Sequence, residues 1–195
     1  MHAVFEGVIE RISRDLSGLT ADSAQVPSNG TAYPLSPQRA VENLLQGYRF
    51  GADTLQRCLQ NGRVTRHQSR SHIQWVLQIM ILSLGHVPDG AELPADLEEK
   101  PVRLAPMSGR ELVRVLQEEL SAMDALLDRC RAKFGMERVA VHPLLGPLRV
   151  DQWRRLYAVY TNCYFQRARG AHSFEPTQNV KLGKEIRIPV HPSVT

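Results

Sequence analysis

Apolar residues recur every three or four positions in five separate stretches, and this spacing limits the possible folds more than any other feature of the sequence. Such spacing places the apolar side chains on one face of a helix. The stretches cover residues 4–16, 41–59, 73–84, 112–130 and 150–169. Each helix must bury its apolar face against other helices. We therefore predict an all-α fold, a four-helix bundle with an extra short helix and one shared core.

Capping residues mark the ends of these helices. Ser36 before Pro37 predicts the start of the second helix, since serine caps the first turn and proline is tolerated there. Gly62 is expected to end that helix. Ser108 and Glu111 have the spacing of a capping box, which predicts the start of a long fourth helix. We expect the last helix to run from about residue 150 to 169.

The segments between these helices carry turn-forming residues. We expect a long loop over 20–33, an irregular crossover over 89–106, and another loop through His142-Pro143 and Gly146-Pro147. The helix over 73–84 is apolar enough to be buried. Any strand should be confined to the tail or to short segments such as 102–104.

The chain divides into a helical bundle over residues 1–170 and an extended C-terminal arm over 171–195. Ile186, Ile188 and Val190 alternate with other residues in the arm and give it one apolar edge. Because such an edge is unlikely to stay in water, we expect the arm to pack on the bundle or on a second subunit, which makes a homodimer possible.

Composition excludes several classes of protein. With 195 residues, the chain fits one domain of ordinary size, and its three cysteines include no C-x-x-C pair that would indicate a zinc ribbon. The first residues do not form a secretory signal, and the longest apolar run is about half of a membrane span. A net charge of +4 is modest for a nucleic-acid-binding protein. We expect a cytoplasmic protein that binds neither nucleic acid nor membranes.

One motif is more specific than these patterns. His142-Pro-Leu-Leu-Gly-Pro-Leu, followed by Trp153, resembles the H-P-x-x-G-x-L turn and tryptophan of an uncharacterised subgroup of the DinB/YfiT-like superfamily. Leu-Ser-Pro at 35–37 and Val-Pro-Asp-Gly at 87–90 also fit that subgroup, and the resemblance covers roughly residues 9–170. It implies a four-helix bundle. Many members bind a divalent metal through histidines of an early helix and the last helix, and some are thiol-dependent transferases, isomerases or hydrolases.

The sequence departs from the subgroup at the metal ligands. Where the subgroup has H-x-x-H-H after the tryptophan, this chain has Tyr160, Cys163 and Tyr164, and Asn43 aligns with the remaining histidine. A neutral amide is a weak ligand, and a phenol must first lose its proton. A single thiolate does not complete a zinc site. We therefore expect no metal and no other cofactor.

Each of these residues has two interpretations. Tyr160 and Tyr164 either offer their hydroxyls to a ligand in the family's cavity or fill that cavity, with hydrogen bonds to Asn43 or the backbone. Cys163 is either a nucleophile or a ligand for a soft metal, or else a small buried apolar residue. His142 is expected to orient its turn through a hydrogen bond, and Trp153 to lie on the inward face of the last helix.

Two functional hypotheses follow from the resemblance and its altered site. The first is a non-catalytic or diverged bundle, without the family's metal site, that binds a small molecule or a protein partner. The second is a metal- or thiol-dependent transferase or hydrolase with an atypical site. The sequence motifs alone leave both open because function depends on the site rather than on the fold.

Overall fold

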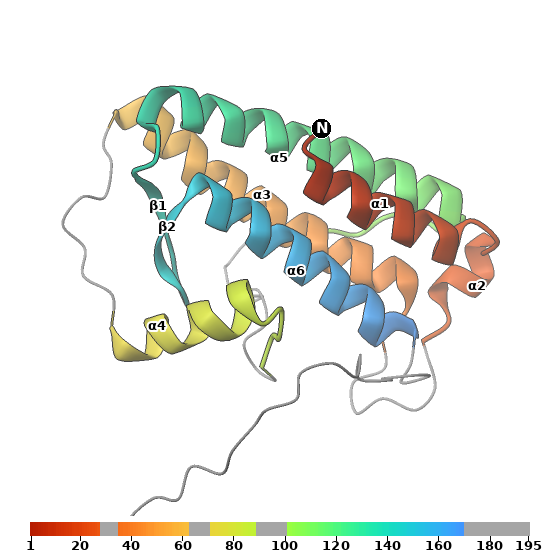
Figure 1. Ribbon diagram of the computed structural model, residues 1–195. Coiled ribbons are helices and arrows are strands. Elements are labelled where there is room, and N and C mark those ends of the chain that lie inside the picture. Colours follow the sequence, from red (N-terminus) through yellow and green to blue (C-terminus); the bar gives the residue numbers. More distant parts are fainter. Residues whose placement is uncertain (28–34, 63–70, 89–100, 170–195) are drawn as a thin grey trace, which may run out of the picture.

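The computed structural model describes residues 1–27, 35–62, 71–88 and 101–169, and helices account for 72% of these residues (Figure 1). The four main helices are α1 (Ala3–Leu16), α3 (Pro37–Asn61), α5 (Gly109–Phe134) and α6 (Val150–Arg169). Shorter elements are α2 (Ala21–Gln25), α4 (His72–Gln78) and the π-helix η1 (Ile79–Ser83), which continues α4. A hairpin joins β1 (Arg138–His142) to β2 (Gly146–Arg149).

The predicted helix ends are confirmed by their capping contacts. The hydroxyl of Ser36 accepts a hydrogen bond from the N–H of Arg39 at 3.1 Å, at the start of α3. That helix ends at Gly62, whose φ of 63° lies in the left-handed region that favours glycine. At the start of α5, the carboxylate of Glu111 accepts the backbone N–H of Ser108 at 2.7 Å. These contacts satisfy donors that a helix end leaves unpaired.

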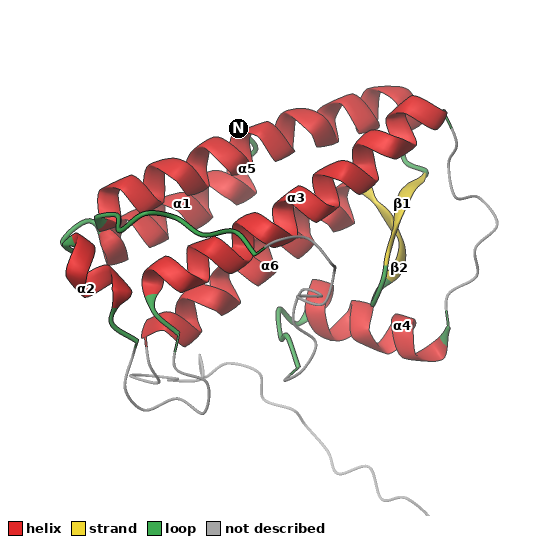
Figure 2. Cartoon of the chain, turned by 180° about the vertical axis from the view of Figure 1, so that it is seen from behind, coloured by secondary structure: helices red, strands yellow, loops and turns green. Residues whose placement is uncertain are grey.

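The four main helices pack around one core. α5 lies between α1 and α3, and α6 packs against both α1 and α3 (Figures 1 and 2). α3 and α5 run in the same direction, because Arg49 pairs with Glu119 near the middle of both helices and Lys133 donates to the carbonyl of Leu59 near the C-terminal end of both. Large side chains with less than 2% exposure fill the core; the largest are Trp153, Tyr48, Tyr157, Tyr160 and Phe5.

A buried ion pair ties three of the helices together. Arg154 of α6 donates to Asp124 of α5 at 2.8 Å and also pairs with Asp128 one turn further along. The backbone N–H of His2, at the start of α1, donates to the other oxygen of Asp124 at 2.6 Å. Because Arg154 is only 7% exposed, its charge depends on these carboxylates for compensation.

Two segments that we predicted as loops contain regular structure. The loop over 20–33 was expected to be irregular, but Thr20 caps the short helix α2 by accepting the N–H of Ser23 at 3.2 Å. The loop around His142 forms the β1–β2 hairpin, whose two short strands lie in a segment that we predicted as a loop. Residues 102–104 form no strand.

The hairpin owes its stability to contacts that are distant in the sequence. Val139, Ala140 and Leu148 are fully buried, and Ala140 pairs with Leu148 across the hairpin. Gly146 has a φ of 72°, which places the turn in the conformation that glycine favours. The strands are therefore held by burial against the helices rather than by a long alternating pattern.

The helix predicted over 73–84 is present as α4 and η1, but only one side of it is buried: Ile81 is in the core, and Leu77 and Leu82 pack against it. Ile73 is 73% exposed, Trp75 54% and Leu84 72%, whereas Gln78 is 5% exposed. Within the described part of the chain, no helix is both long and apolar enough to span a membrane. The predicted arm over 171–195 lies outside the described residues, as do most of the predicted crossover and residues 28–33 of the predicted loop.

Candidate functional site

The structure places the four predicted cavity residues on two neighbouring helices. Tyr48 of α3 contacts Thr161 of α6, and Gly51 of α3 lies against Tyr157, so the two helices run antiparallel. In this register the half-buried Asn43 lies level with the turn that holds Tyr164. Tyr160 lies one turn away, level with Tyr48. Tyr160, Cys163 and Tyr164 therefore share one face of α6, since they are three and four positions apart.

Tyr160 and Tyr164 point into packed protein, and Cys163 lies at the edge of their face. Tyr160 is fully buried, Tyr164 is 6% exposed, and Cys163 is half-buried. Burial raises the pKa of the Tyr160 hydroxyl well above its usual value of 10, and the neighbouring Tyr164 and Cys163 raise it further. Tyr160 therefore keeps its proton at neutral pH. A protonated phenol is a poor ligand for a divalent metal.

The space between α3 and α6 is filled by a seam of aromatic and hydroxyl groups. Thr161 donates to the carbonyl oxygen of Tyr157 and accepts a hydrogen bond from the hydroxyl of Tyr48. The rings of Tyr48 and Tyr157 meet edge to face, with centroids 5.2 Å apart. On α3, a Cβ at Gly51 would overlap the Tyr157 hydroxyl. This packing requires a glycine at that position because no larger residue fits against the tyrosine.

His142 has the structural role that we predicted. Its Nδ1 accepts the backbone N–H groups of Leu144 and Leu145, both at 3.3 Å, and thereby orders the hairpin turn. Its ring lies edge-on to Trp153, with centroids 5.6 Å apart. Burial lowers the pKa of His142 to about 4, so the imidazole is neutral at physiological pH. Trp153, 1% exposed, lies on the inward face of α6 as predicted.

Three buried polar atoms between the hairpin and α3 have no hydrogen-bond partner among the described residues. They are His142 Nε2, Trp153 Nε1 and the Tyr157 hydroxyl. Because Nδ1 of His142 accepts two N–H groups, Nε2 carries the ring proton and is a donor. The three groups lie along the side chains that contact one another from the hairpin to α3. Burying these atoms without a hydrogen-bond partner costs free energy, because they lose their contacts with water. The packing of the surrounding aromatic rings offsets this cost.

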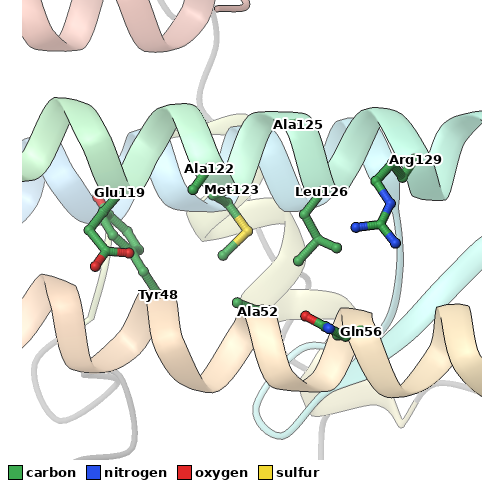
Figure 3. Close-up of a pocket in the computed structure, with 9 residues that line it drawn as sticks. All are labelled: Tyr48, Ala52, Gln56, Glu119, Ala122, Met123, Ala125, Leu126 and Arg129. Carbon is green, nitrogen blue, oxygen red and sulfur yellow. The ribbon is translucent and has the colours of Figure 1, made fainter.

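A shallow groove lies on the outer side of α3 and α5 (Figure 3). Its volume is about 230 Å³. The side chains of Met123 and Leu126 of α5 point across it toward Ala52 of α3, and Glu119 and Arg129 lie at its two ends. None of the four predicted cavity residues lines this groove. It combines an apolar floor with opposite charges at the rim.

A second, polar depression of about 340 Å³ lies at the start of α3. Its central group is Glu42, which is 5% exposed. This carboxylate accepts hydrogen bonds from Arg39 at 2.9 Å and from the backbone N–H of Leu104 at 3.0 Å, and it pairs with Arg103 at 3.4 Å. These contacts fasten the segment that precedes α5 to α3. The carboxylate already compensates one of the two arginine charges.

The described residues do not assemble a metal site. Among them, no three His, Cys, Asp or Glu side chains lie close enough together to bind one ion. Cys58 of α3 and Cys130 of α5 are thiols whose pKa values are raised by burial, that of Cys130 to about 11. At neutral pH both remain protonated, so neither is an activated nucleophile.

The largest surface feature was missed by the sequence patterns. Eight large apolar residues of the described chain are exposed, and five of them lie between residues 73 and 84. They form what we call the α4–η1 face, made of Ile73, Trp75, Val76, Ile79 and Leu84. Their helical spacing was visible in the sequence, but the spacing does not tell which side of the helix meets the protein. The one sequence signal was the absence of charged residues from 71–88.

Comparison of the chain with known protein families, curated proteins and solved structures found no match.

Proposed function

We propose that this chain is a diverged DinB-like bundle that binds a protein partner and has lost the metal chemistry of the family. The proposal keeps the resemblance carried by the His142 turn and Trp153. The observation that carries it is the burial of Tyr160 and Tyr164, which occupy the positions of family histidines. Buried, protonated phenols fill space and do not bind a divalent ion.

The structure favours a protein over a small molecule as the ligand. Pockets for small molecules usually enclose about 300–1,000 Å³ and bury most of the ligand. The apolar groove between α3 and α5 is smaller, about 230 Å³, and open to the surface. The larger depression beside Glu42 is polar, and its carboxylate already pairs with Arg39 and Arg103. In contrast, exposed apolar side chains gather on one helical segment.

A metal titration tests the non-catalytic part of this proposal. We expect calorimetry of the purified full chain with Zn²⁺ and Ni²⁺ to show no stoichiometric, sub-micromolar binding, and elemental analysis to find no bound metal. The matched variant is Tyr160→Phe with Tyr164→Phe, which keeps both rings and removes the hydroxyls. Sub-micromolar binding by the unmodified chain that this double variant abolishes would show that the family's site is still functional.

A second titration gives a positive control. The variant with Asn43→His, Tyr160→His, Cys163→His and Tyr164→His restores a histidine at every aligned position. Because positions 160, 163 and 164 share one face of α6 and position 43 lies level with position 164, we expect this variant to gain Zn²⁺ binding that the unmodified chain lacks. Absence of binding would show that these positions do not converge and that the loss of the site involves more than residue type.

A further inference from the structure

The segment that carries the α4–η1 face is apolar on two sides: Ile81 is buried in the core, with Leu77 and Leu82 packed against it, and the five residues of the face lie outward. A surface helix normally buries its apolar side and exposes its polar side. Here Ile73, Trp75 and Leu84 are 73%, 54% and 72% exposed. Gln78, in contrast, is 5% exposed. The exposure of so many large apolar groups on one element indicates a surface that another molecule covers.

Polar side chains, together with the buried Ile81, hold this segment against the body and fix the direction of its exposed apolar side. Gln78 donates from Nε2 to the carbonyl oxygen of Leu145 at 2.6 Å, and its own oxygen lies 3.5 Å from the amide nitrogen of Gln152. Gln74 caps the helix through the backbone N–H of Ser71 and packs against Gly146. Arg155 of α6 donates to the carbonyl of Leu82. The apolar side is therefore left outward by specific contacts.

The backbone of the segment is also unusual. After Gln78 the helix widens into the π-helix η1, in which the N–H of Leu84 bonds to the carbonyl of Ile79 at 3.1 Å. Such π-helical turns are rare and occur often at functional sites. This one lies within the apolar face, between Ile79 and Leu84, and sets their relative directions.

The charge of the segment restricts what can cover it. Residues 71–88 include no Asp, Glu, Lys or Arg. A helix that lies on a membrane surface carries lysines and arginines along its polar side, which this segment lacks. A partner with charged groups opposite this face would have to bury them unpaired, at a high cost. The partner surface must therefore be as uncharged and apolar as this one.

We propose that the α4–η1 face binds the same face of a second copy of this chain. This inference rests on the proposed function, of which it names the partner. The face is complementary to itself because it is apolar and carries no charge, so a two-fold axis through it brings matching groups together. The other exposed large apolar residues of the described chain, Met1, Val26 and Met136, lie on different elements and offer no comparable surface.

The two-fold arrangement predicts which residues meet. The segment is about 18 Å long, and in an antiparallel pair the Ile73 end of one copy lies against the Leu84 end of the other. Trp75 and Ile79 lie between these ends, where the interface excludes water. Tryptophan is among the types of side chain that contribute most to binding.

Sedimentation equilibrium of the full chain tests the proposal. We expect a concentration-dependent dimer that Ile73→Glu with Leu84→Glu weakens at least about 100-fold in Kd, because buried carboxylates at both ends of the face would be unpaired. Both side chains are more than 70% exposed, so the variant should keep the circular dichroism spectrum and melting curve of the native fold. The matched control, Val26→Glu with Met136→Glu, changes exposed apolar residues elsewhere and should leave Kd unchanged.

Charge complementation sharpens the same test. A chain with Ile73→Glu alone and a chain with Leu84→Lys alone should each dimerise poorly. Their mixture should form a heterodimer, because the antiparallel arrangement places the new glutamate against the new lysine. Failure of the mixture to associate, when the unmodified chain dimerises, would contradict the antiparallel geometry.

Three outcomes would overturn the proposal. The first is that the unmodified chain remains a monomer at every concentration. The second is that it forms a dimer that the Ile73→Glu, Leu84→Glu variant leaves intact. The third is that it remains a monomer and sediments with phosphatidylserine-containing vesicles through this face. Each refutes self-association here and leaves the metal titration unaffected. Failure of this inference is therefore distinguishable from failure of the proposed loss of metal chemistry.

Discussion

The two tryptophans of the chain lie on two apolar helices that have opposite surroundings. Trp153 of α6 is 1% exposed, whereas Trp75 of α4 is 54% exposed. α6 is enclosed by α1, α3, α5 and η1, and residues all around the helix are buried. α4 meets the rest of the described protein through Gln74, Leu77 and Gln78. An apolar stripe therefore shows that a helix needs a covering surface, but not that its own chain supplies one.

This contrast also separates two ways in which polar residues are used. In α6, Thr161 bonds within the seam with Tyr48, and Arg154 pairs with Asp124, so polar groups are enclosed by apolar packing. In α4, the glutamines share the inner side with Leu77, and the larger part of the apolar surface, formed by Ile73, Trp75 and Val76, is outside. The first arrangement stabilises the monomer. The second positions a surface without contributing much apolar burial to the fold.

The largest expected effect comes from shortening each tryptophan. Trp153→Ala leaves a large cavity in the core and should reduce the free energy of unfolding by about 3–5 kcal/mol. Trp75→Ala removes a side chain that the monomer leaves half-exposed. This change should alter the free energy of unfolding by no more than about 0.5 kcal/mol. Urea unfolding of both variants at a concentration below dimerisation measures the two values. Similar losses would break the distinction between the two helices.

The next effect is a dependence of stability on pH at the hairpin. His142 has a pKa of about 4 in the folded chain, below the usual 6.5, because the ring is buried. Between these values the unfolded chain takes up a proton that the folded chain does not. Stability is therefore lost as the pH falls from about 6.5 to 4, by roughly 3 kcal/mol in total.

His142→Asn provides the control for that titration. Its amide oxygen can still accept the N–H groups of Leu144 and Leu145, but the side chain does not titrate. We compare urea unfolding of the two chains across this range, so that the shared contribution of the carboxylates cancels. Equal pH profiles for both chains would show that the imidazole takes up a proton in the folded state as readily as in the unfolded state.

A smaller effect should arise where α3 and α6 approach most closely. Gly51→Ala places a methyl group on the Tyr157 hydroxyl and should destabilise the fold by about 1–3 kcal/mol through overpacking. Tyr157→Phe alone should be nearly neutral, since the hydroxyl has no partner among the described residues. In the double variant, Tyr157→Phe should recover part of the loss. Strict additivity of the two changes would show that the two residues are not in contact.

The features that the sequence predicted correctly depend on neighbours in the chain. The caps at Ser36, Gly62 and Glu111 each involve residues within four positions, so the sequence contains all of the information needed. The hairpin was missed because its strands are short and are held by burial against helices. Val139 and Val141 with Gly146 were the available signal, but two alternating valines are too few to distinguish a strand from a loop.

The candidate site shows the same division between local and distant information. The role of His142 followed from its own turn, where Nδ1 accepts the N–H groups two and three residues later. The seam of Tyr48, Tyr157 and Thr161 was not predicted, because it depends on the antiparallel register of α3 and α6. Likewise, the outward direction of Trp75 depends on a contact between Gln78 and Leu145, which lie far apart in the sequence.

Collisional quenching of tryptophan fluorescence by acrylamide, followed against protein concentration, tests the central claim most directly. Only Trp75 is accessible in the monomer, since Trp153 is 1% exposed, so the unmodified chain needs no substitution to report on this face. If the α4–η1 face binds a second copy, quenching should be strong in dilute solution. It should decline as the dimer forms, and remain strong in the Ile73→Glu, Leu84→Glu variant. Strong quenching of the unmodified chain at all concentrations, including those at which it sediments as a dimer, would contradict the claim.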